Sequence, residues 1–120
     1  MENNIKDLGF ELIHIGVNCE DAEDAKRTAE LFARAFGFGL REGKASYFAG
    51  NCIECMRGSG KGRNGHIAIG TVDVDRAAAW LESQGFELDA SSRTQDPDGR
   101  TRAIYLKDEI AGFAVHLLRK

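Results

Sequence analysis

The sequence has no long hydrophobic run, and no apolar segment approaches the length needed to cross a membrane. The first residues also lack the charged-then-apolar order of a signal peptide, because Glu11 and His14 interrupt the apolar part. We therefore expect a cytoplasmic protein that does not associate with a membrane.

Cysteine is scarce, and its number is odd. Three cysteines in 120 residues do not make a disulfide framework, so we expect reduced thiols. Cys52 and Cys55 form a C-x-x-C pair, but a strand is predicted there, and residues three apart on a strand point to opposite faces. The pair is expected neither to cross-link nor to chelate a metal together.

Positive charge is not in excess either. The net charge is −3, the basic residues are scattered, and aromatic residues make up only 8% of the chain. A basic stripe and a base-stacking platform are both missing, which argues against nucleic acid as a partner. With 42% hydrophobic residues, the chain fits one globular domain spanning residues 1–120.

One pattern occurs twice. A histidine opens an alternating apolar strand in Ile13-His14-Ile15-Gly16-Val17 and again, 52 residues later, in His66-Ile67-Ala68-Ile69-Gly70. Each strand is followed by an acidic, alanine-rich segment with helical spacing, capped by Asp21 or Asn18 in the first case and by Asp73 in the second. The repeat predicts two βαβββ modules: module 1 at about 11–57 and module 2 at about 66–119.

The expected elements are helices at 21–36 and 73–84 and strands at 11–17, 40–42, 45–49, 52–56, 66–71, 86–94, 100–107 and 112–118. We expect an α+β fold in which the two modules form a curved mixed sheet with the helices on its convex side. Residues 1–9 carry no periodicity and are expected to be a loose lead-in.

A glycine-rich joint, residues 58–65, separates the modules. A phosphate-binding Walker loop is one interpretation, but such a loop needs Ser or Thr after its lysine and then a helix. Here Gly62 follows Lys61, and a strand comes next. A flexible connector is the preferred interpretation.

Polar residues on strands point to a metal site. All three histidines, His14, His66 and His116, lie on predicted strands, on the face opposite the β-branched residues. Glu54 occupies the position in module 1 that His116 occupies in module 2. Imidazoles and a carboxylate converging from separate strands suit Zn, Ni, Co, Fe or Mn better than Ca or Mg. A solvated outer face is the alternative explanation for Glu54.

Further along the expected cleft, Arg102 and Tyr105 are candidates to bind a substrate carboxylate or phosphate. Arg57 and Arg100 lie at similar strand ends. For each arginine, a solvated side chain is the alternative.

These residues resemble the vicinal oxygen chelate superfamily, which contains glyoxalase I, the bleomycin resistance proteins and ring-cleaving dioxygenases. The matching pieces are His14-Ile-Gly-Val17, Ile53-Glu54, Asn64-Gly-His-Ile-Ala-Ile-Gly-Thr71 and Gly112-Phe-Ala-Val-His116. The resemblance covers nearly the whole chain and implies that His14, Glu54, His66 and His116 hold a divalent metal ion. The ending from Glu109 to His116 is also similar to domains associated with bacterial 2-keto-3-deoxy-phosphogluconate aldolases.

The resemblance implies a metal-dependent lyase or isomerase for a small substrate with vicinal oxygens, in which the ion stabilises an enolate or oxyanion. Glu54, the one carboxylate in the set, is the candidate for proton transfer. Glyoxalase I has a glutamate where this chain has His116, so its own activity is not implied. A non-catalytic binding domain linked to sugar-acid metabolism and a ring-cleaving dioxygenase remain alternatives. A homodimer is expected, with the modules paired either within one chain or between chains.

Overall fold

The computed structural model describes residues 5–58 and 60–120. Two helices and eight strands follow the predicted order, preceded by a short 3₁₀ helix, η1 (Ile5–Leu8). The elements of the first half are β1 (Glu11–Asn18), α1 (Ala22–Phe36), β2 (Leu40–Glu42), β3 (Ser46–Ala49) and β4 (Ile53–Met56). Those of the second half are β5 (Gly65–Thr71), α2 (Val74–Ser83), β6 (Leu88–Gln95), β7 (Thr101–Leu106) and β8 (Phe113–Arg119).

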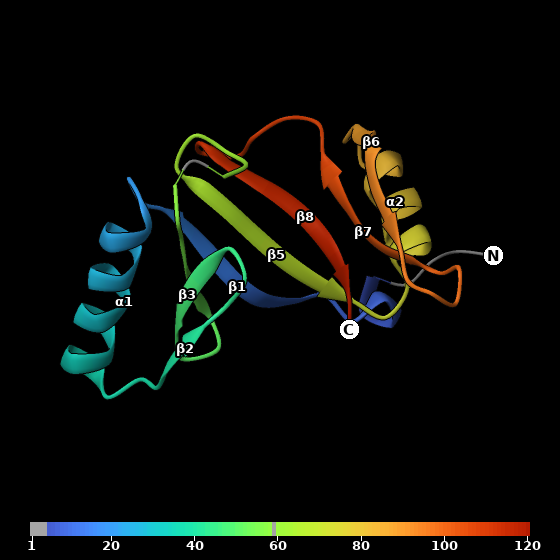
Figure 1. The fold of residues 1–120 in the computed structure, drawn as a ribbon. Coiled ribbons are helices and arrows are strands. Elements are labelled where there is room, and N and C mark those ends of the chain that lie inside the picture. The colour runs from blue at the N-terminus through green and yellow to red at the C-terminus, as the bar shows by residue number, and fades with distance from the viewer. Residues whose placement is uncertain (1–4, 59) are drawn as a thin grey trace.

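The eight strands form one sheet in the order β2-β3-β4-β1-β5-β8-β7-β6. In each half, the first strand pairs in parallel with the last, as β1 does with β4 and β5 with β8. The two halves meet where β1 pairs antiparallel with β5, so the modules join within one chain (Figure 1). The predicted α+β class with two βαβββ modules is confirmed.

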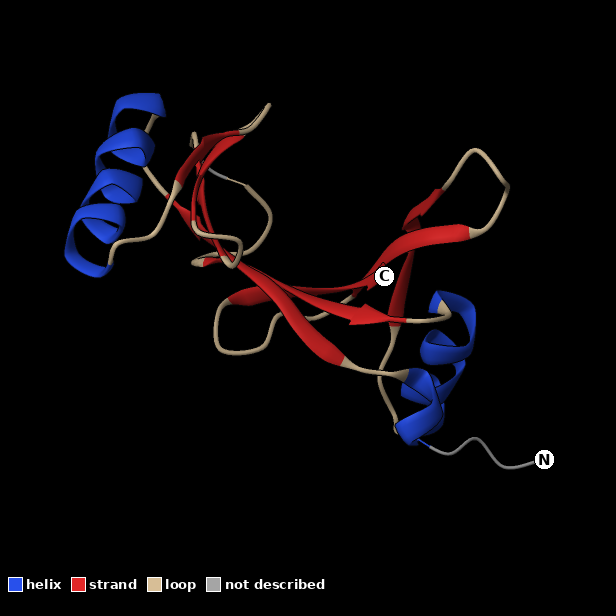
Figure 2. Ribbon diagram, turned by 90° about the horizontal axis from the view of Figure 1, so that it is seen from below, coloured by secondary structure: helices blue, strands red, loops and turns tan. Residues whose placement is uncertain are grey.

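The sheet is strongly curved, and the helices lie outside its curve at opposite ends, as Figure 2 shows. Helix α1 packs on β3 and β4, and α2 packs on β7 and β8. The concave face is thereby left free of helices, which is where the polar strand residues were expected to gather.

Local signals explain the helix limits. The Asp21 side chain accepts a hydrogen bond from the backbone N–H of Asp24 and so caps α1, which ends at Gly37 with φ of 75°. Asp73 caps α2 in the same way through Arg76 N–H. The predicted helices are therefore confirmed to within a residue or two.

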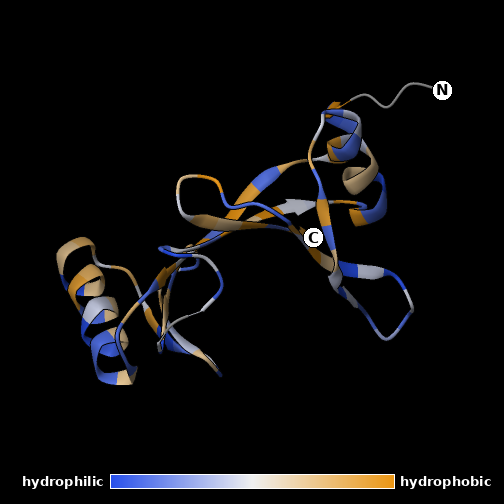
Figure 3. Cartoon of the chain, turned by 90° about the horizontal axis from the view of Figure 1, so that it is seen from above, coloured by the Kyte–Doolittle hydropathy of each residue, from blue (hydrophilic) through white to orange (hydrophobic). Residues whose placement is uncertain are grey.

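Two apolar clusters stabilise the two halves of the fold separately. Figure 3 shows hydrophobic residues along the strands, and on the helices hydrophobic residues alternate with hydrophilic ones. One cluster joins α1 to its strands and the other joins α2 to its strands. Their buried members are Cys19, Ala25, Ala29, Ala49 and Cys55 in the first, and Leu8, Val74, Ala77, Ile104 and Leu117 in the second.

The expectation of a loose lead-in was wrong for the part that the structure describes. Leu8 is fully buried in the second cluster, and its carbonyl accepts hydrogen bonds from Thr71 Oγ1 at 2.6 Å and Val72 N at 3.1 Å. The few apolar residues of this polar segment show no periodicity, so the sequence pattern missed Leu8. Residues 1–4 of that expected lead-in lie outside the described residues.

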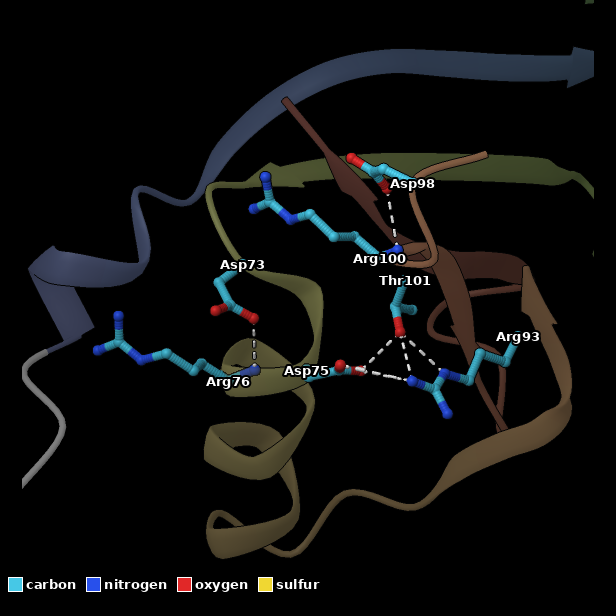
Figure 4. A network of polar contacts seen from close by, with 7 residues as sticks. All are labelled: Asp73, Asp75, Arg76, Arg93, Asp98, Arg100 and Thr101. Carbon is cyan, nitrogen blue, oxygen red and sulfur yellow. Dashed lines mark hydrogen bonds and ion pairs between the residues drawn. The ribbon is translucent and has the colours of Figure 1, made fainter. Parts of the chain in front are cut away.

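A polar network fastens the start of α2 to β6 and β7 (Figure 4). The Thr101 hydroxyl donates to Asp75 Oδ1 at 2.8 Å and accepts from Arg93 Nε at 2.9 Å. Asp75 lies on α2, Arg93 on β6 and Thr101 on β7, so one buried hydroxyl links three elements.

No helix in residues 5–58 or 60–120 is long and apolar enough to cross a membrane.

Candidate metal centre

Four side chains from four adjacent strands meet on the concave face. They are Glu54 of β4, His14 of β1, His66 of β5 and His116 of β8. Ligand nitrogens of the three histidines all lie within 4.8 Å of one another. Glu54 Oε1 is 3.3 Å from His14 Nε2 and 3.1 Å from His66 Nε2. The structure thus brings together the four residues that the repeat had singled out.

Strand register explains why these side chains fit together. On β1, Gly16 lies between Glu54 of β4 and His66 of β5. On β5, Ala68 lies between His14 of β1 and His116 of β8. Gly16 and Ala68 occupy equivalent places in the two modules, and both are buried. In each module a small residue makes room for two large polar side chains.

Gly16 is the tighter of the two positions. A Cβ built on Gly16 would lie 2.0 Å from Cε1 of the His66 ring. His66 therefore lies against the β1 backbone, and a side chain at position 16 would displace it. The requirement for glycine here comes from this close approach.

Ser46 completes the surroundings of Glu54. This buried serine of β3 donates a hydrogen bond from Oγ to Glu54 Oε2 at 2.7 Å, while Oε1 faces the histidines. Sequence reasoning missed Ser46, and it noted Gly16 on the histidine face without assigning it a role. The available signal was a polar residue opening a short strand directly before the strand that carries Glu54.

The charges in the cluster favour metal binding. The hydrogen bond from His66, followed by that from Ser46, holds the pKa of Glu54 below its usual value, so the carboxylate is ionised at neutral pH. Burial lowers the pKa of His14, and burial with the neighbouring His66 and His14 lowers the pKa of His116 to about 4. His14 and His116 are therefore neutral near pH 7, as metal ligation requires.

The donor set fits a divalent ion. Three imidazoles and one carboxylate are the nitrogen and oxygen donors that borderline transition metals bind. Among the described residues, Nδ1 of His116 is buried without a hydrogen-bond partner, which is costly for a polar atom that binds nothing. His14, His66, His116 and Glu54 would hold the ion, and no described residue other than these supplies a nitrogen or carboxylate to the cluster.

The two candidate substrate-binding residues lie in different surroundings. The Tyr105 ring stacks on His116, with 4.7 Å between ring centroids and 26° between planes. Burial, and then the charge of Glu54, raises the pKa of Tyr105, so its hydroxyl stays protonated. Arg102 instead forms an ion pair with Asp96 at 3.1 Å, and its side chain is 59% exposed. The structure brings Tyr105 to the histidines, and it shows Arg102 in contact with Asp96 rather than with them.

Solved structures share this fold. Methylmalonyl-CoA epimerase from Mycobacterium tuberculosis is 16% identical, over 98% of this chain and 92% of that chain, with a TM-score of 0.65. A variant of the Streptomyces coelicolor methylmalonyl-CoA epimerase, in complex with 2-nitronate-propionyl-CoA, is 20% identical over 92% and 94%, with a TM-score of 0.60. A hypothetical protein from Bacillus halodurans C-125 is 17% identical over 93% and 95%, with a TM-score of 0.62.

No protein-family model and no curated protein sequence matches the chain. At these identities the structural likeness establishes the fold. The chain therefore has the fold of these methylmalonyl-CoA epimerases.

Proposed function

We propose that this chain is a metal-dependent enzyme of the isomerase or lyase type, acting on a small substrate with vicinal oxygens. The observation that carries the proposal is the convergence of three imidazoles within 4.8 Å, with Glu54 against two of them. A divalent ion held by His14, His66, His116 and Glu54 would act as a Lewis acid toward substrate oxygens. The likeness to epimerases of this fold supports the same class of chemistry.

Glu54 is the candidate base. It is ionised, half-buried and, among the described residues, the carboxylate in contact with the histidines. Its lowered pKa makes it a weak base while His66 and Ser46 hold it. Proton abstraction would therefore require Glu54 to loosen from the ion as well as from His66, which raises the basicity of the carboxylate. The hydrogen bond from Ser46 to the other oxygen keeps the carboxylate oriented during that movement.

Tyr105 is proposed to bind the substrate beside His116. A protonated hydroxyl can donate a hydrogen bond to a substrate oxygen, and the stacked ring fixes its direction. For Arg102, substrate binding would require the guanidinium to leave Asp96. We retain Arg102 only as a residue that a large substrate could recruit.

The test has two parts. Protein purified without chelators is expected to contain close to one Zn, Ni, Co, Fe or Mn ion per chain, measured by elemental analysis. Solvent-proton exchange is then followed by NMR in deuterated water with methylmalonyl-CoA and a panel of 2-hydroxy and 2-oxo acids. Exchange at the carbon next to a carbonyl is expected for at least one of them.

The variant Glu54→Gln is expected to retain the metal and to lose exchange, while Glu87→Gln, which alters an exposed ion pair with Lys107, behaves as wild type. Unchanged exchange in Glu54→Gln would remove Glu54 from the role of base. Failure to bind any of these ions would contradict the metal site itself.

A second function is favoured by the lowered pKa of Glu54. A weakly basic carboxylate suits permanent metal ligation, as in a non-catalytic accessory domain that binds a metal or a metabolite. Metal at close to one ion per chain without exchange for any compound of the panel would select this alternative.

We further propose that the protein works as a homodimer, which light scattering of the purified protein would test.

A further inference from the structure

Two cations flank the histidine cluster, one in each module. On the module 1 side, the guanidinium carbon of Arg41 lies 4.0 Å from the centroid of the Phe48 ring. That ring meets His14 edge to face, with centroids 6.2 Å apart. Arg41 and Phe48 are cross-strand partners on β2 and β3, so they share the face that carries Glu54.

On the module 2 side, the ammonium of Lys61 lies 4.5 Å from the centroid of the Tyr105 ring. Tyr105 is the ring that stacks on His116. Phe48 pairs with Glu54, and Tyr105 pairs with His116, so the two rings occupy corresponding places in the two modules. In the strand order, β3 and β7 lie on opposite sides of the strands that carry the histidines.

The glycine-rich joint places Lys61, and one side chain fixes that joint on both sides of the lysine. Asn18 Nδ2 donates to the carbonyl of Gly62 at 2.8 Å, and Asn18 Oδ1 accepts from the N–H of Gly60 at 3.2 Å. Asn18 is on β1, four residues beyond His14. The strand that provides a histidine therefore also sets the position of Lys61.

Neither cation forms an ion pair with an acidic residue in the part of the chain that the structure describes. Among the ion pairs of the described residues, every one involves a base other than Arg41 or Lys61; these bases are His14, His66, Arg27, Arg57, Arg93, Arg102, Lys107, Arg119 and Lys120. Both side chains are exposed, and an aromatic face is the contact that holds each of them.

Acidic residues do lie near Lys61. Asp89, Asp108 and Glu109 line the same cavity of about 140 Å³ as Lys61 and Tyr105. However, Asp89 accepts hydrogen bonds from Ser91, and Glu109 accepts one from the N–H of Arg63. Hydrogen bonds from Ser91 and, to a smaller extent, the charge of Lys61 lower the pKa of Asp89. Lys61 therefore attracts Asp89 without forming an ion pair with it, and its ammonium can still bind a ligand.

We propose that Arg41 and Lys61 make this cleft a site for a small anion that carries one acidic group at each end and vicinal oxygens between them. The inference rests on the proposed function, because the histidine cluster would bind the central oxygens. A divalent ion, Glu54 and the two cations together carry three formal positive charges, which favours a ligand with more than one negative charge. Each cation binds one end, so the pair selects for an acidic group at both ends of the ligand.

The test compares three linear six-carbon polyols. 6-Phosphogluconate has a carboxylate at one end and a phosphate at the other, gluconate lacks the phosphate, and glucitol 6-phosphate lacks the carboxylate. Titration calorimetry of the zinc-loaded protein is expected to show 6-phosphogluconate binding at least about tenfold more tightly than either analogue, because each end adds a charge-assisted contact.

Single variants identify which cation binds which end of the ligand. Arg41→Gln and Lys61→Gln are each expected to weaken binding of 6-phosphogluconate about tenfold. Each should also weaken only one of the two analogues, a different one in each variant. Two matched controls bind as wild type: Arg27→Gln, whose guanidinium pairs with Asp24, and Lys120→Gln, whose ammonium pairs with Glu11.

Equal affinity for the three polyols, or binding by Arg41→Gln and Lys61→Gln that matches the controls, would overturn the proposal. Zinc uptake is measured first and separates this inference from the proposed function. A protein that takes up no metal contradicts the metal site. The same three titrations on metal-free protein then still decide whether the two cations select a ligand that is acidic at both ends, by the same order of affinities.

Discussion

Gly16 on β1 lies directly opposite His66 on β5, and the imidazole covers the glycine so closely that no side chain fits between them. This contact fixes where the His66 ring lies and thereby where its nitrogens meet Glu54 and His14. The geometry of the candidate metal centre thus depends on a residue that offers no ligand atom.

Gly16→Ala is therefore expected to weaken metal binding about 10- to 100-fold, the range seen when the support of a ligand is lost. The added Cβ would lie 2.0 Å from Cε1 of His66, so the ring must move away. Competition with a fluorescent zinc chelator measures the effect. Gly39→Ala is the matched control, because a Cβ there meets nothing within 4 Å. Affinities that agree between the two variants would show that His66 adapts without cost.

Thr101→Val is expected to lower the free energy of unfolding by about 1 kcal/mol, the usual contribution of a hydrogen bond. The hydroxyl joins Asp75 and Arg93 (Figure 4), and both of these side chains are partly exposed, so water can replace the lost contacts. Urea denaturation provides the measurement. Thr94→Val, an exposed threonine on β6, serves as the control and should unfold at the wild-type midpoint.

The three thiols are expected to differ in reactivity. Cys52 is exposed, whereas Cys19 and Cys55 are buried in the cluster under α1. Burial raises the pKa of both buried thiols, that of Cys55 to about 11, which reduces the reactive thiolate further. A chromogenic disulfide reagent should titrate one thiol quickly and the other two only after denaturation. Cys52→Ser should abolish the fast phase, and a second fast thiol would contradict this burial.

The sequence allowed the fold and the convergence of His14, Glu54, His66 and His116 to be predicted, since strand alternation and a 52-residue repeat determine which face each residue occupies. Their role as metal ligands remains a prediction. Alternation assigns faces but not the register between strands, so it could not show which residues lie opposite each other. The contacts of His66 with Gly16 and of Glu54 with Ser46 depend on register and were missed for that reason.

Arg102 shows a related limit. A strand position near the expected cleft suggested substrate binding, but the long side chain reaches Asp96 in the turn between β6 and β7. The end of a flexible arginine goes to the nearest favourable carboxylate, which position along a strand does not indicate.

The exposure of Phe36 differs from what its position in the helix indicates. Phe36 has the helical spacing of a core residue, yet it is 66% exposed, because it ends α1 beyond the strands that the helix covers.

Ser46 provides the last prediction, which concerns the orientation of Glu54. Ser46 Oγ donates to Oε2 at 2.7 Å, and this hydrogen bond is one of the causes that lower the pKa of Glu54. Ser46→Ala removes the donor from a fully buried position and leaves an oxygen of the carboxylate without it. The pKa of Glu54 is then expected to rise and the carboxylate to rotate more freely.

Two measurements follow from that change in Ser46→Ala. Metal affinity is expected to fall about tenfold, because an outer hydrogen bond that orients a ligand is lost. The pH at which half of the metal is released should rise, since a carboxylate with a higher pKa is protonated at a higher pH. Ser83→Ala, which removes an exposed hydroxyl bonded to a carbonyl on α2, should leave both values unchanged. Lower affinity with an unchanged release pH would mean that Ser46 positions Glu54 without affecting its protonation.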